Sequence, residues 1–419
     1  MSDIARQIKD MAVQAKKAAR EMAALSTEKK DRLLFKMAEG LEKQKDLIQA
    51  ENRKDLEAGR EKGLSDAMLD RLELSDKVIA SMIQGLKEVT ALPDPVGEIS
   101  DMARRPSDIV VGRMRIPLGV IGMIYESRPN VTVDAACLCL KAGNSILLRG
   151  GSEAINSNLA LAGVLQEAVK SEGVNPAAVQ VIPVTDREGV NVMLGLSGEL
   201  DLIIPRGGEG LIRFVAENSS IPVLKHYKGV CHAFVDESAD LEMAAAIVVN
   251  SKAQRPGVCN SLETLLVHED IAPAFLPLVA EKLIESGVEI RGCERTTSIV
   301  SAVKSAVAGD YGQEFLDLIL AVKVVKDLDG ALDHIAAYGS QHTETIITSN
   351  YARSQRFLRE VDSSSVMINA STRFSDGGQY GLGAEIGIST TKIHAYGPMG
   401  LKELTTKKFI VYGNGEVRE

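Results

Sequence analysis

The feature that most constrains this fold is an alternation, along most of the chain, of short continuous apolar stretches with longer amphipathic ones. The stretch GVIGMIY (119–125) is apolar at both odd and even positions, so neither face of a strand made from it can lie against water. Such strands are typical of parallel sheets, in which helical crossovers cover both faces. The alternation therefore predicts an α/β fold with parallel sheets.

The apolar stretches fall into two consecutive series. The first comprises GVIGMIY, NSILLRG, AVQVIPV, LDLIIP and IPVLKH. The second comprises CHAFVD, LETLLV, LAVKVV, TIITS and SSVMINA. Stretches with helical periodicity, such as 155–171, lie between most of them. We therefore expect two parallel-sheet domains in series, with a boundary near Cys231, and a division of the chain into 1–230, 231–365 and 366–419.

The first 90 residues have helical periodicity instead of apolar stretches. Apolar residues recur there at steps of three and four, as in Ile8, Met11, Ala15, Ala18 and Met22. Ser26 or Thr27 is expected to cap a second helix, and Ser65 and Ser75 to cap two more. Charged amphipathic helices of this kind usually pack by one face, so we assign them no chemistry.

Two further segments are predicted to form exposed strands. Residues 105–117 alternate weakly between polar and apolar side chains, which indicates a hairpin. The tail KKFIVYGNG (407–415) indicates one more strand. Because exposed strand edges pair readily with other chains, both segments are candidates for contacts between subunits, and we expect a homo-oligomer.

Composition narrows the class of protein. The 419 residues carry 48 basic and 57 acidic side chains, a formal net charge of −9, which argues against nucleic acid as a partner. The first 21 residues lack the apolar core of a secretory signal, and no apolar run approaches a membrane span. The five cysteines are scattered without a C-x-x-C pair, so neither a disulfide framework nor a structural zinc site is expected. We expect a cytoplasmic protein.

One cysteine stands in an unusual setting. Cys259, in AQRPGVCNSLET (253–264), follows a Pro-Gly bend and precedes polar residues. Such a turn presents a side chain and leaves backbone N–H groups that can stabilise an oxyanion. The segment alone suits either a nucleophile or a packed interior thiol.

Glycine turns follow two of the predicted strands, in KAGNSILLRGGSEA (141–154) and in IIPRGGEG (203–210). A glycine turn that leads into a helix suits phosphate binding, and it equally suits a tight strand-to-helix connection. No G-x-G-x-x-G follows the early strands, so a dinucleotide would bind without that fingerprint.

Several of these segments together resemble the aldehyde dehydrogenase superfamily. CLKAGNSILLRGGSEA is similar to its K-x-G-N-x-x-x-L-K-P-S-E pattern, and the segments that match its Asn, Cys and Glu motifs are ESRPNV, GVCNS and GAEIG. The γ-glutamyl phosphate reductase branch resembles the chain more closely, above all in VKDLDGALDHIAAYGSQHTETI (325–346). Further segments that resemble this branch are SRPNVTVDAA, LRGGSEA, AQRPGVCN, GLGAEIGIST and GPMGLKELTT.

The resemblance implies a reaction. Members of the branch reduce γ-glutamyl phosphate with NADPH to glutamate 5-semialdehyde, the second step of proline biosynthesis. Cys259 would then be the nucleophile that forms a thioester. The side-chain amide of Asn130 and the backbone N–H of Cys259 would hold the oxyanion. The domain before residue 231 would bind NADPH, 231–365 would carry the nucleophile, and 366–419 would return to the cofactor domain.

The resemblance also implies cofactor contacts. Arg149 occupies the Lys position of the superfamily at the adenosine ribose, and the Glu position falls on Ser152, or on Glu153 if the alignment contains a one-residue gap. A serine beside an arginine would accept the 2′-phosphate of NADPH. The glycine turn at Gly207 and Gly208 (205–210) would lie near the cofactor phosphates. Glu385 would hold the nicotinamide ribose.

Basic residues in the matched segments are candidates for binding the substrate's carboxylate and phosphate: Arg128, Lys225, Arg255 and Arg373. His226 stands at or near the position of the superfamily's water-activating Glu, and the lack of a carboxylate between 221 and 232 is consistent with a reductase. His334 and His342 are interpreted as structural or supporting residues, and no metal site is expected.

Three other functions remain open on the sequence alone. An aldehyde oxidiser of the same fold would need a water-activating carboxylate. A cysteine hydrolase or acyltransferase would need a histidine paired with Cys259. A non-catalytic protein would not need the thiol at all. The lability of an acyl phosphate makes the glutamate 5-kinase that produces it a candidate partner.

Overall fold

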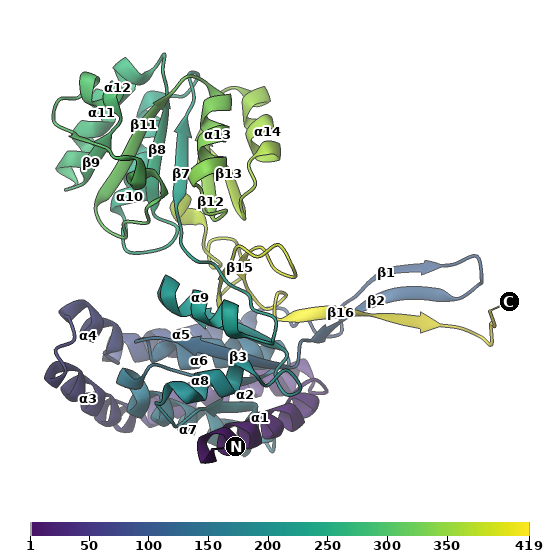
Figure 1. The fold of residues 1–419 in the computed structure, drawn as a ribbon. Coiled ribbons are helices and arrows are strands. Elements are labelled where there is room, and N and C mark those ends of the chain that lie inside the picture. Colours follow the sequence, from purple (N-terminus) through teal and green to yellow (C-terminus); the bar gives the residue numbers. More distant parts are fainter. Residues whose placement is uncertain (1, 419) are drawn as a thin grey trace. The chain divides into compact units, whose positions relative to one another are not determined.

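The strands and helices of the computed structural model, which describes residues 2–418, form two units (Figure 1). Unit 1 contains the described residues of Met1–Lys225, Leu382–Gly387 and Met399–Glu419, and unit 2 contains His226–Gly381 and Ile388–Pro398. The sequence analysis put the first boundary near Cys231 and the return after 365. Residues 366–381 belong to unit 2 instead, because hydrogen bonds connect them to it, including one from the Asn260 side-chain amide to the Ser375 carbonyl, 2.8 Å.

Unit 1 begins with five helices, the four that were predicted and α3, which was not: α1 (Asp3–Met22), α2 (Thr27–Lys43), α3 (Lys45–Glu61), α4 (Asp66–Leu72) and α5 (Asp76–Ala91). Helix α1 buries four of the five residues of the predicted stripe, Ile8, Ala15, Ala18 and Met22. The Ser26 side chain accepts from the Lys29 N–H and so caps α2.

A parallel sheet in the order β5-β4-β3-β6 forms the centre of unit 1. Its strands are β3 (Val120–Tyr125), β4 (Ser145–Arg149), β5 (Val179–Val181) and β6 (Leu202–Arg206), and its helices are α6 (Asn130–Lys141), α7 (Ile155–Ser171), α8 (Arg187–Leu194) and α9 (Glu209–Asn218). Short 3-10 turns are η1 (Ser152–Ala154) and η2 (Pro176–Ala178). Val120 and Ile124 pack with α1, while the Tyr125 hydroxyl lies 2.6 Å from Thr132 of α6. The sheet is therefore covered on both faces, as predicted.

The last stretch of the first series, IPVLKH (221–226), is not a strand. It makes one parallel bridge, between Val223 and Ile203 of β6. Pro222 has no N–H to donate to a sheet ladder, and the segment leads directly to the boundary after Lys225. The prediction of a fifth strand here was wrong.

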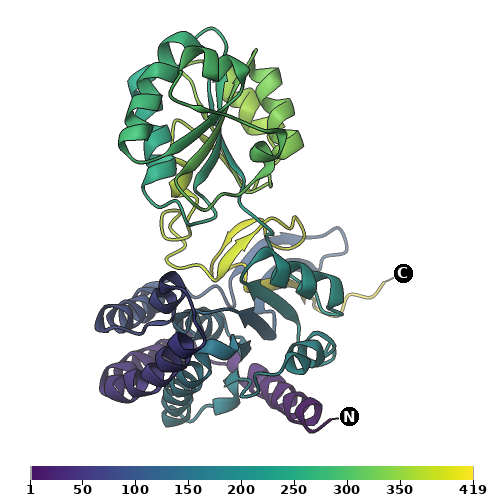
Figure 2. The same ribbon diagram turned by 60° about the vertical axis from the view of Figure 1, so that its left-hand side comes forward.

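Unit 2 is built on a parallel sheet with helices on both sides (Figure 2). Its strands follow the order β10-β9-β11-β8-β7-β12-β13. The strands are β7 (Cys231–Val235), β8 (Leu262–His268), β9 (Glu289–Gly292), β10 (Lys304–Ser305), β11 (Ile319–Val325), β12 (Thr343–Ile347) and β13 (Ser365–Ile368). The helices are α10 (Leu241–Ala253), α11 (Ala272–Glu285), α12 (Glu294–Ile299), α13 (Leu328–Tyr338) and α14 (Tyr351–Glu360), with η3 (Ala308–Gly312) and η4 (Thr372–Phe374). Ala233 packs toward α10 and α11, and its neighbour Phe234 toward α13 and α14.

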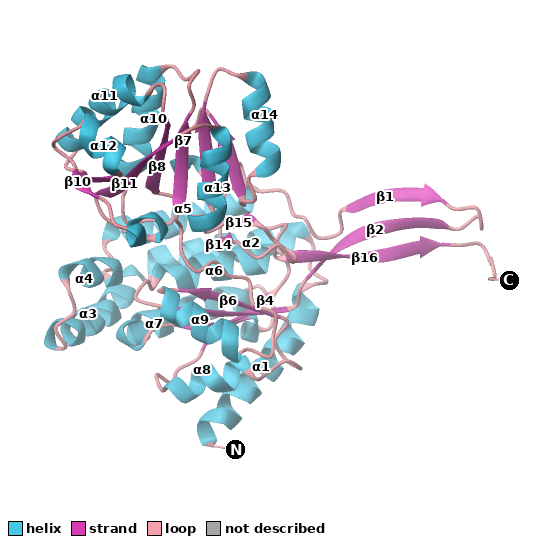
Figure 3. Cartoon of the chain, turned by 45° about the horizontal axis from the view of Figure 1, so that its top comes forward, coloured by secondary structure: helices cyan, strands magenta, loops and turns pink. Residues whose placement is uncertain are grey.

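A three-stranded antiparallel sheet projects from the rest of unit 1 (Figure 3). It joins β1 (Ile99–Arg104), β2 (Val110–Pro117) and β16 (Thr405–Tyr412) in the order β1-β2-β16. The predicted hairpin therefore exists but begins at Ile99, so that 105–117 covers only its turn and second strand. Two short strands, β14 (Gly387–Ser389) and β15 (Gly397–Met399), form a separate pair.

All five cysteines are free thiols. Within residues 2–418, no helix combines the length and the apolar character that crossing a bilayer requires.

Candidate active site

Cys259 lies in the turn between α10 and β8 and is partly exposed. The next residues fix the turn: the Asn260 side chain donates to the Ser375 carbonyl, and the Ser261 N–H donates to the Val258 carbonyl, 3.0 Å. Among the other thiols, burial raises the pKa of Cys137, Cys139 and Cys231, which keeps them protonated. Cys259 is thus an accessible thiol on an anchored turn.

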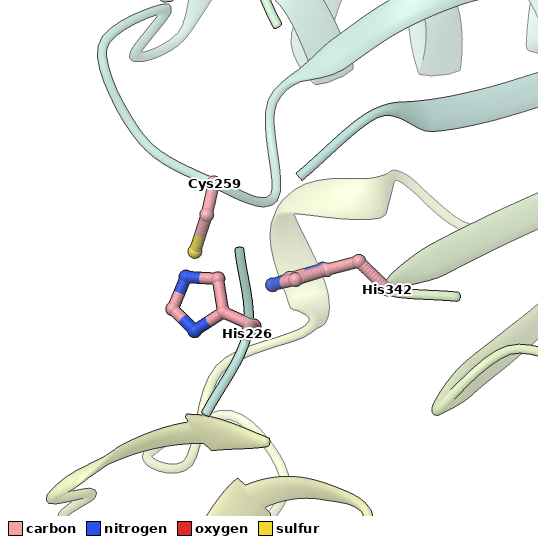
Figure 4. A group of neighbouring side chains, drawn as sticks. All are labelled: His226, Cys259 and His342. Carbon is pink, nitrogen blue, oxygen red and sulfur yellow. The ribbon is translucent and has the colours of Figure 1, made fainter. Parts of the chain in front are cut away.

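Two histidines face this thiol. The Cys259 Sγ and one ring nitrogen each of His226 and His342 all lie within 4.8 Å of one another. The imidazole centroids are 5.6 Å apart and the rings meet edge to face at 70° (Figure 4). A cysteine–histidine pairing, which the sequence could not establish, is therefore present.

Strand order explains why residues so distant in sequence meet. His226 lies before β7, Cys259 before β8 and His342 immediately before β12. Strand β7 is paired in parallel with β8 on one side and with β12 on the other. The amino ends of three adjacent strands therefore bring the thiol and both imidazoles to one edge of the sheet.

A hydrogen bond to the backbone defines the tautomer of His226. Its Nδ1 lies 2.9 Å from the carbonyl oxygen of Ile388. Because a carbonyl only accepts, Nδ1 must carry the proton, and the neutral ring then has its lone pair on Nε2. The ring nitrogen on the side of Cys259 points toward the sulfur (Figure 4). In the neutral ring, the unprotonated nitrogen of His226 therefore faces the thiol.

The chain entering β7 passes very close to the Cys259 backbone. A Cβ added at Gly229 would lie 1.9 Å from the Cys259 carbonyl oxygen, so only glycine fits there. Two residues later, the Cys231 thiol donates to the same carbonyl, 3.2 Å away. Sequence analysis missed both residues, since the contact joins segments thirty positions apart.

Two of the predicted anion-binding arginines lie near the thiol in unit 2. The Arg373 Nε donates to the Gln254 side chain, 2.8 Å, which places this guanidinium beside the turn of Cys259. Burial, and next the charge of Arg255, lower the pKa of Arg373, while Cys259 is among the groups that oppose this shift. Arg255 itself is exposed. Both cations therefore lie where they would attract an anion to the turn of Cys259.

Most of the predicted cofactor residues lie at the carboxyl ends of strands in unit 1, together with two residues predicted for other roles. The cofactor residues are Arg149, Ser152 and Glu153, at or after β4, and Gly207 and Gly208, after β6. Arg128, predicted to bind substrate, and Asn130, predicted to hold the oxyanion, follow β3. Because β4, β3 and β6 are adjacent and parallel, these loops meet at one edge of the sheet. The carboxyl edge of such a sheet is where nucleotides usually bind.

Carboxylates tie these loops together. Glu153 accepts from the Ser127 N–H, 2.7 Å, and from its hydroxyl, 2.6 Å. Glu126 accepts from the Gly208 N–H, 2.9 Å. Glu153 is therefore engaged with the neighbouring loop, whereas Ser152 is exposed.

Arg149 is held at the end of β4 through backbone carbonyls. It donates to Gly150, 3.0 Å, and to Thr185, 2.8 Å. Burial lowers its pKa, and the charges of Glu153 and Asp186 oppose that shift. The guanidinium is thus fixed at the carboxyl edge by bonds that do not neutralise it.

Asn130, the first residue of α6, already has a partner. Its amide donates to Asp134 one helical turn later, 3.0 Å. Burial raises the pKa of Asp134 to about 6, and the bond from Asn130 opposes that rise. Sequence analysis missed Asp134, although the i, i+4 spacing was visible.

The remaining predicted residues lie in other segments of the chain. Lys225 is the last residue of unit 1 before the chain enters unit 2. Glu385 lies in the return segment Leu382–Gly387, where the next residue, Ile386, donates to the Met399 carbonyl, 3.0 Å. His334 is buried under β7 and β11, between His232, Tyr311 and Tyr338.

Comparisons with known proteins show the family to which the chain belongs. The aldehyde dehydrogenase family model matches residues 2–308. The chain is 61% identical over 411 residues to a gamma-glutamyl phosphate reductase of Desulfotalea psychrophila, covering 98% of each protein. It is 60% identical to that of Geobacter metallireducens, covering 99% of this chain and all of that one. The crystal structure of the gamma-glutamyl phosphate reductase of Thermotoga maritima superposes with a TM-score of 0.97 at 49% identity, over 98% of this chain and 100% of that one.

Proposed function

This chain belongs to the aldehyde dehydrogenase family, in its γ-glutamyl phosphate reductase branch, and from that premise we propose that it reduces L-glutamyl 5-phosphate with NADPH through a thioester on Cys259. The observation that carries the proposal is the accessible Cys259 thiol faced by the Nε2 side of His226. The product would be glutamate 5-semialdehyde, the intermediate of proline biosynthesis.

The thiol has to be deprotonated before it can attack. His226 would accept the thiol proton on Nε2 while its Nδ1–H stays bound to the Ile388 carbonyl. The cations Arg255 and Arg373 would stabilise the thiolate. The thiolate would then form a bond to the acyl carbon, and the C–O bond to phosphate would break, leaving a thioester.

The second half returns the enzyme to its starting state. NADPH, when bound, supplies a hydride to the thioester carbonyl carbon. The Asn130 amide and the Cys259 N–H would donate to the oxygen as charge develops on it. The C–S bond then breaks, the aldehyde leaves, and the sulfur recovers its proton from His226. One acyl phosphate, one NADPH and one proton give one aldehyde, NADP⁺ and phosphate.

The carboxyl edge of the unit 1 sheet fits the adenosine end of NADPH. Arg149 is held there by carbonyls and Ser152 is exposed, while the Glu153 carboxylate is occupied by Ser127. A guanidinium and a hydroxyl would accept a 2′-phosphate that a carboxylate would repel. Gly207 and Gly208 would line the cofactor phosphates, and Glu385 would hold the nicotinamide ribose.

The substrate's two anionic ends require basic partners. Arg255 and Arg373 would bind the phosphate beside Cys259, because their charges already interact there. Arg128 and Lys225 would bind the carboxylate.

We further propose a cytoplasmic homo-oligomer that pairs through the projecting sheet. Its outer strands β1 and β16 expose Met102, Phe409, Val411 and Tyr412. Exposed apolar side chains on strands with unpaired edges favour pairing with a second copy. The kinase that makes the acyl phosphate remains a candidate partner, and a kinase mixture with no faster transfer than free diffusion would exclude it.

The deciding experiment runs the reaction in reverse, following NADP⁺ reduction by glutamate 5-semialdehyde with and without inorganic phosphate. We expect turnover to require both phosphate and Cys259, so that the Cys259→Ala variant is inactive. Turnover without phosphate would instead identify an aldehyde oxidiser.

The His226–Cys259 pairing also favours one alternative, a cysteine hydrolase. That enzyme would release phosphate from an acyl phosphate without NADPH, at a rate that depends on Cys259. Phosphate release measured in the absence of cofactor therefore separates the two functions.

A further inference from the structure

The group of His226, Cys259 and His342 has a feature that reduction of an acyl phosphate does not explain. The reaction needs one base at the thiol, and His226 provides it. His342 adds a second imidazole within 4.8 Å. Three donor atoms, one sulfur and two ring nitrogens, converge from three adjacent strands (Figure 4).

Both imidazoles are oriented as metal-binding histidines usually are. The Nδ1 of His226 lies 2.9 Å from the Ile388 carbonyl, and the Nδ1 of His342 lies 2.9 Å from the Thr343 hydroxyl. A metal-bound histidine commonly donates its second N–H to a carbonyl or hydroxyl in this way, which presents the other nitrogen to the ion. The outer nitrogen of His342 points toward the His226 ring (Figure 4).

The donor set selects the class of ion. One thiolate with two imidazoles suits Zn²⁺, which takes four ligands in a tetrahedron and can complete it with water. Bond lengths of about 2.0–2.3 Å put tetrahedral ligand atoms roughly 3.3–3.8 Å apart, so modest side-chain rotations would close the group around an ion. Mg²⁺ and Ca²⁺ prefer oxygen ligands and would not compete.

We propose that Zn²⁺ binds reversibly to His226, Cys259 and His342 and inhibits the enzyme by occupying its nucleophile. The inhibition rests on the proposed function, whereas the site itself does not. Arg255 and Arg373 lie close enough to oppose a cation. Their charges make the site weak enough for a chelator to empty it, and a bound anionic substrate would exclude the ion.

Binding is measured on the full-length chain, freed of metal, by titrating Zn²⁺ against a coloured zinc indicator, with Mg²⁺ as the ion control. We expect one site per chain. Losing a ligand, in Cys259→Ser or His342→Asn, should weaken it by at least the roughly 10- to 100-fold that loss of an outer partner costs. Zn²⁺ should also slow alkylation of Cys259 by iodoacetamide in the wild type.

The matched control is a second group of possible ligands in unit 2, Glu237, His268 and Asp270, whose two carboxylates are exposed. Zinc affinity should be unchanged in His268→Asn. Loss of zinc in His268→Asn, or wild-type affinity in Cys259→Ser, would overturn the assignment. His342 is fully buried, so if His342→Asn does not fold, the one-atom change Cys259→Ser and the alkylation assay decide.

The two proposals fail separately. A chain that reduces the acyl phosphate but leaves Cys259 equally reactive with and without Zn²⁺ overturns the zinc site alone. A chain in which Zn²⁺ protects Cys259 but no NADPH-dependent activity is found supports the zinc site and overturns the proposed function.

Discussion

The contact between Gly229 and the Cys259 backbone yields a sharp test of how the proposed nucleophile is held. A methyl group at Gly229 would lie 1.9 Å from the Cys259 carbonyl oxygen and 2.7 Å from its carbon. Both are backbone atoms, so no side-chain rotation relieves the collision. An ordinary contact begins near 3.4 Å, so the two segments must separate by about 1.5 Å.

Hydrogen bonds on both sides of the contact oppose this separation and set its free-energy cost. The Gly229 N–H donates to Glu314, 2.9 Å, and the turn of Cys259 is tied to the Ser375 carbonyl through Asn260. Forcing an extra methyl into such a contact typically costs about 1–3 kcal/mol of stability. Displacing a reacting group by roughly 1 Å can cost about 10²-fold in rate. Gly229→Ala should therefore fold with reduced stability and lose about two orders of magnitude in kcat.

The assay is phosphate-dependent NADP⁺ reduction by glutamate 5-semialdehyde, with urea unfolding measured on the same samples. Gly309→Ala, also in unit 2, is the control, because an added Cβ there meets nothing within 4 Å. A folded Gly229→Ala enzyme with wild-type kcat would refute the argument, since the nucleophile would then tolerate a displaced backbone.

Three further outcomes are expected. Burial lowers the pKa of His334 to about 3, below its ordinary 6.5, so between these two pH values the unfolded chain binds a proton that the folded chain does not. The free energy of unfolding therefore falls as the pH drops below 6.5, by on the order of 2 kcal/mol near pH 5. His334→Gln should flatten the pH dependence of urea unfolding. Lys252 and Glu263 form a fully buried ion pair at 2.7 Å. Lys252→Met should lower the free energy of unfolding by about 3–5 kcal/mol in the same assay, because it leaves the Glu263 carboxylate buried without its partner. The double variant Lys252→Met/Glu263→Leu should restore much of that loss, and an equally unstable double variant would contradict the argument. Phe409→Glu should shift the chain toward a smaller species in sedimentation while Val307→Glu, also exposed, should not, and identical profiles would exclude the projecting sheet as the interface.

Local patterns predicted the elements well where burial is complete. The strands β3, β4, β7 and β8 are buried at nearly every position, and all four lie where the sequence indicated. The strands β9 and β10, at one side of the unit 2 sheet, were not predicted. They carry exposed or charged side chains, which removes the signal of a doubly covered strand. The resemblance to the γ-glutamyl phosphate reductases and the aldehyde dehydrogenase-like fold are confirmed by the comparisons.

The site was predictable in parts but not as an arrangement. Cys259 and Arg149 could be proposed from the sequence because the turn of Cys259 is local and Arg149 ends an apolar strand. The approach of His226 and His342 to Cys259 depends on the order β8-β7-β12, which no local pattern specifies. The bond from Ile388 to His226 spans 162 positions and has no sequence signal.

That bond has a consequence for how the enzyme is made. The sheet of unit 2 is complete once residue 368 has been synthesised, yet the carbonyl that orients His226 belongs to Ile388, in a segment that returns after Gly387. Unit 1 is completed later still, because the Asn144 side chain donates to the Leu404 carbonyl, 2.9 Å. During synthesis, Cys259 would therefore pack into unit 2 before the Ile388 carbonyl that orients His226 has been made. The proposed thiol–imidazole pair is complete only after both segments of unit 2 have been synthesised.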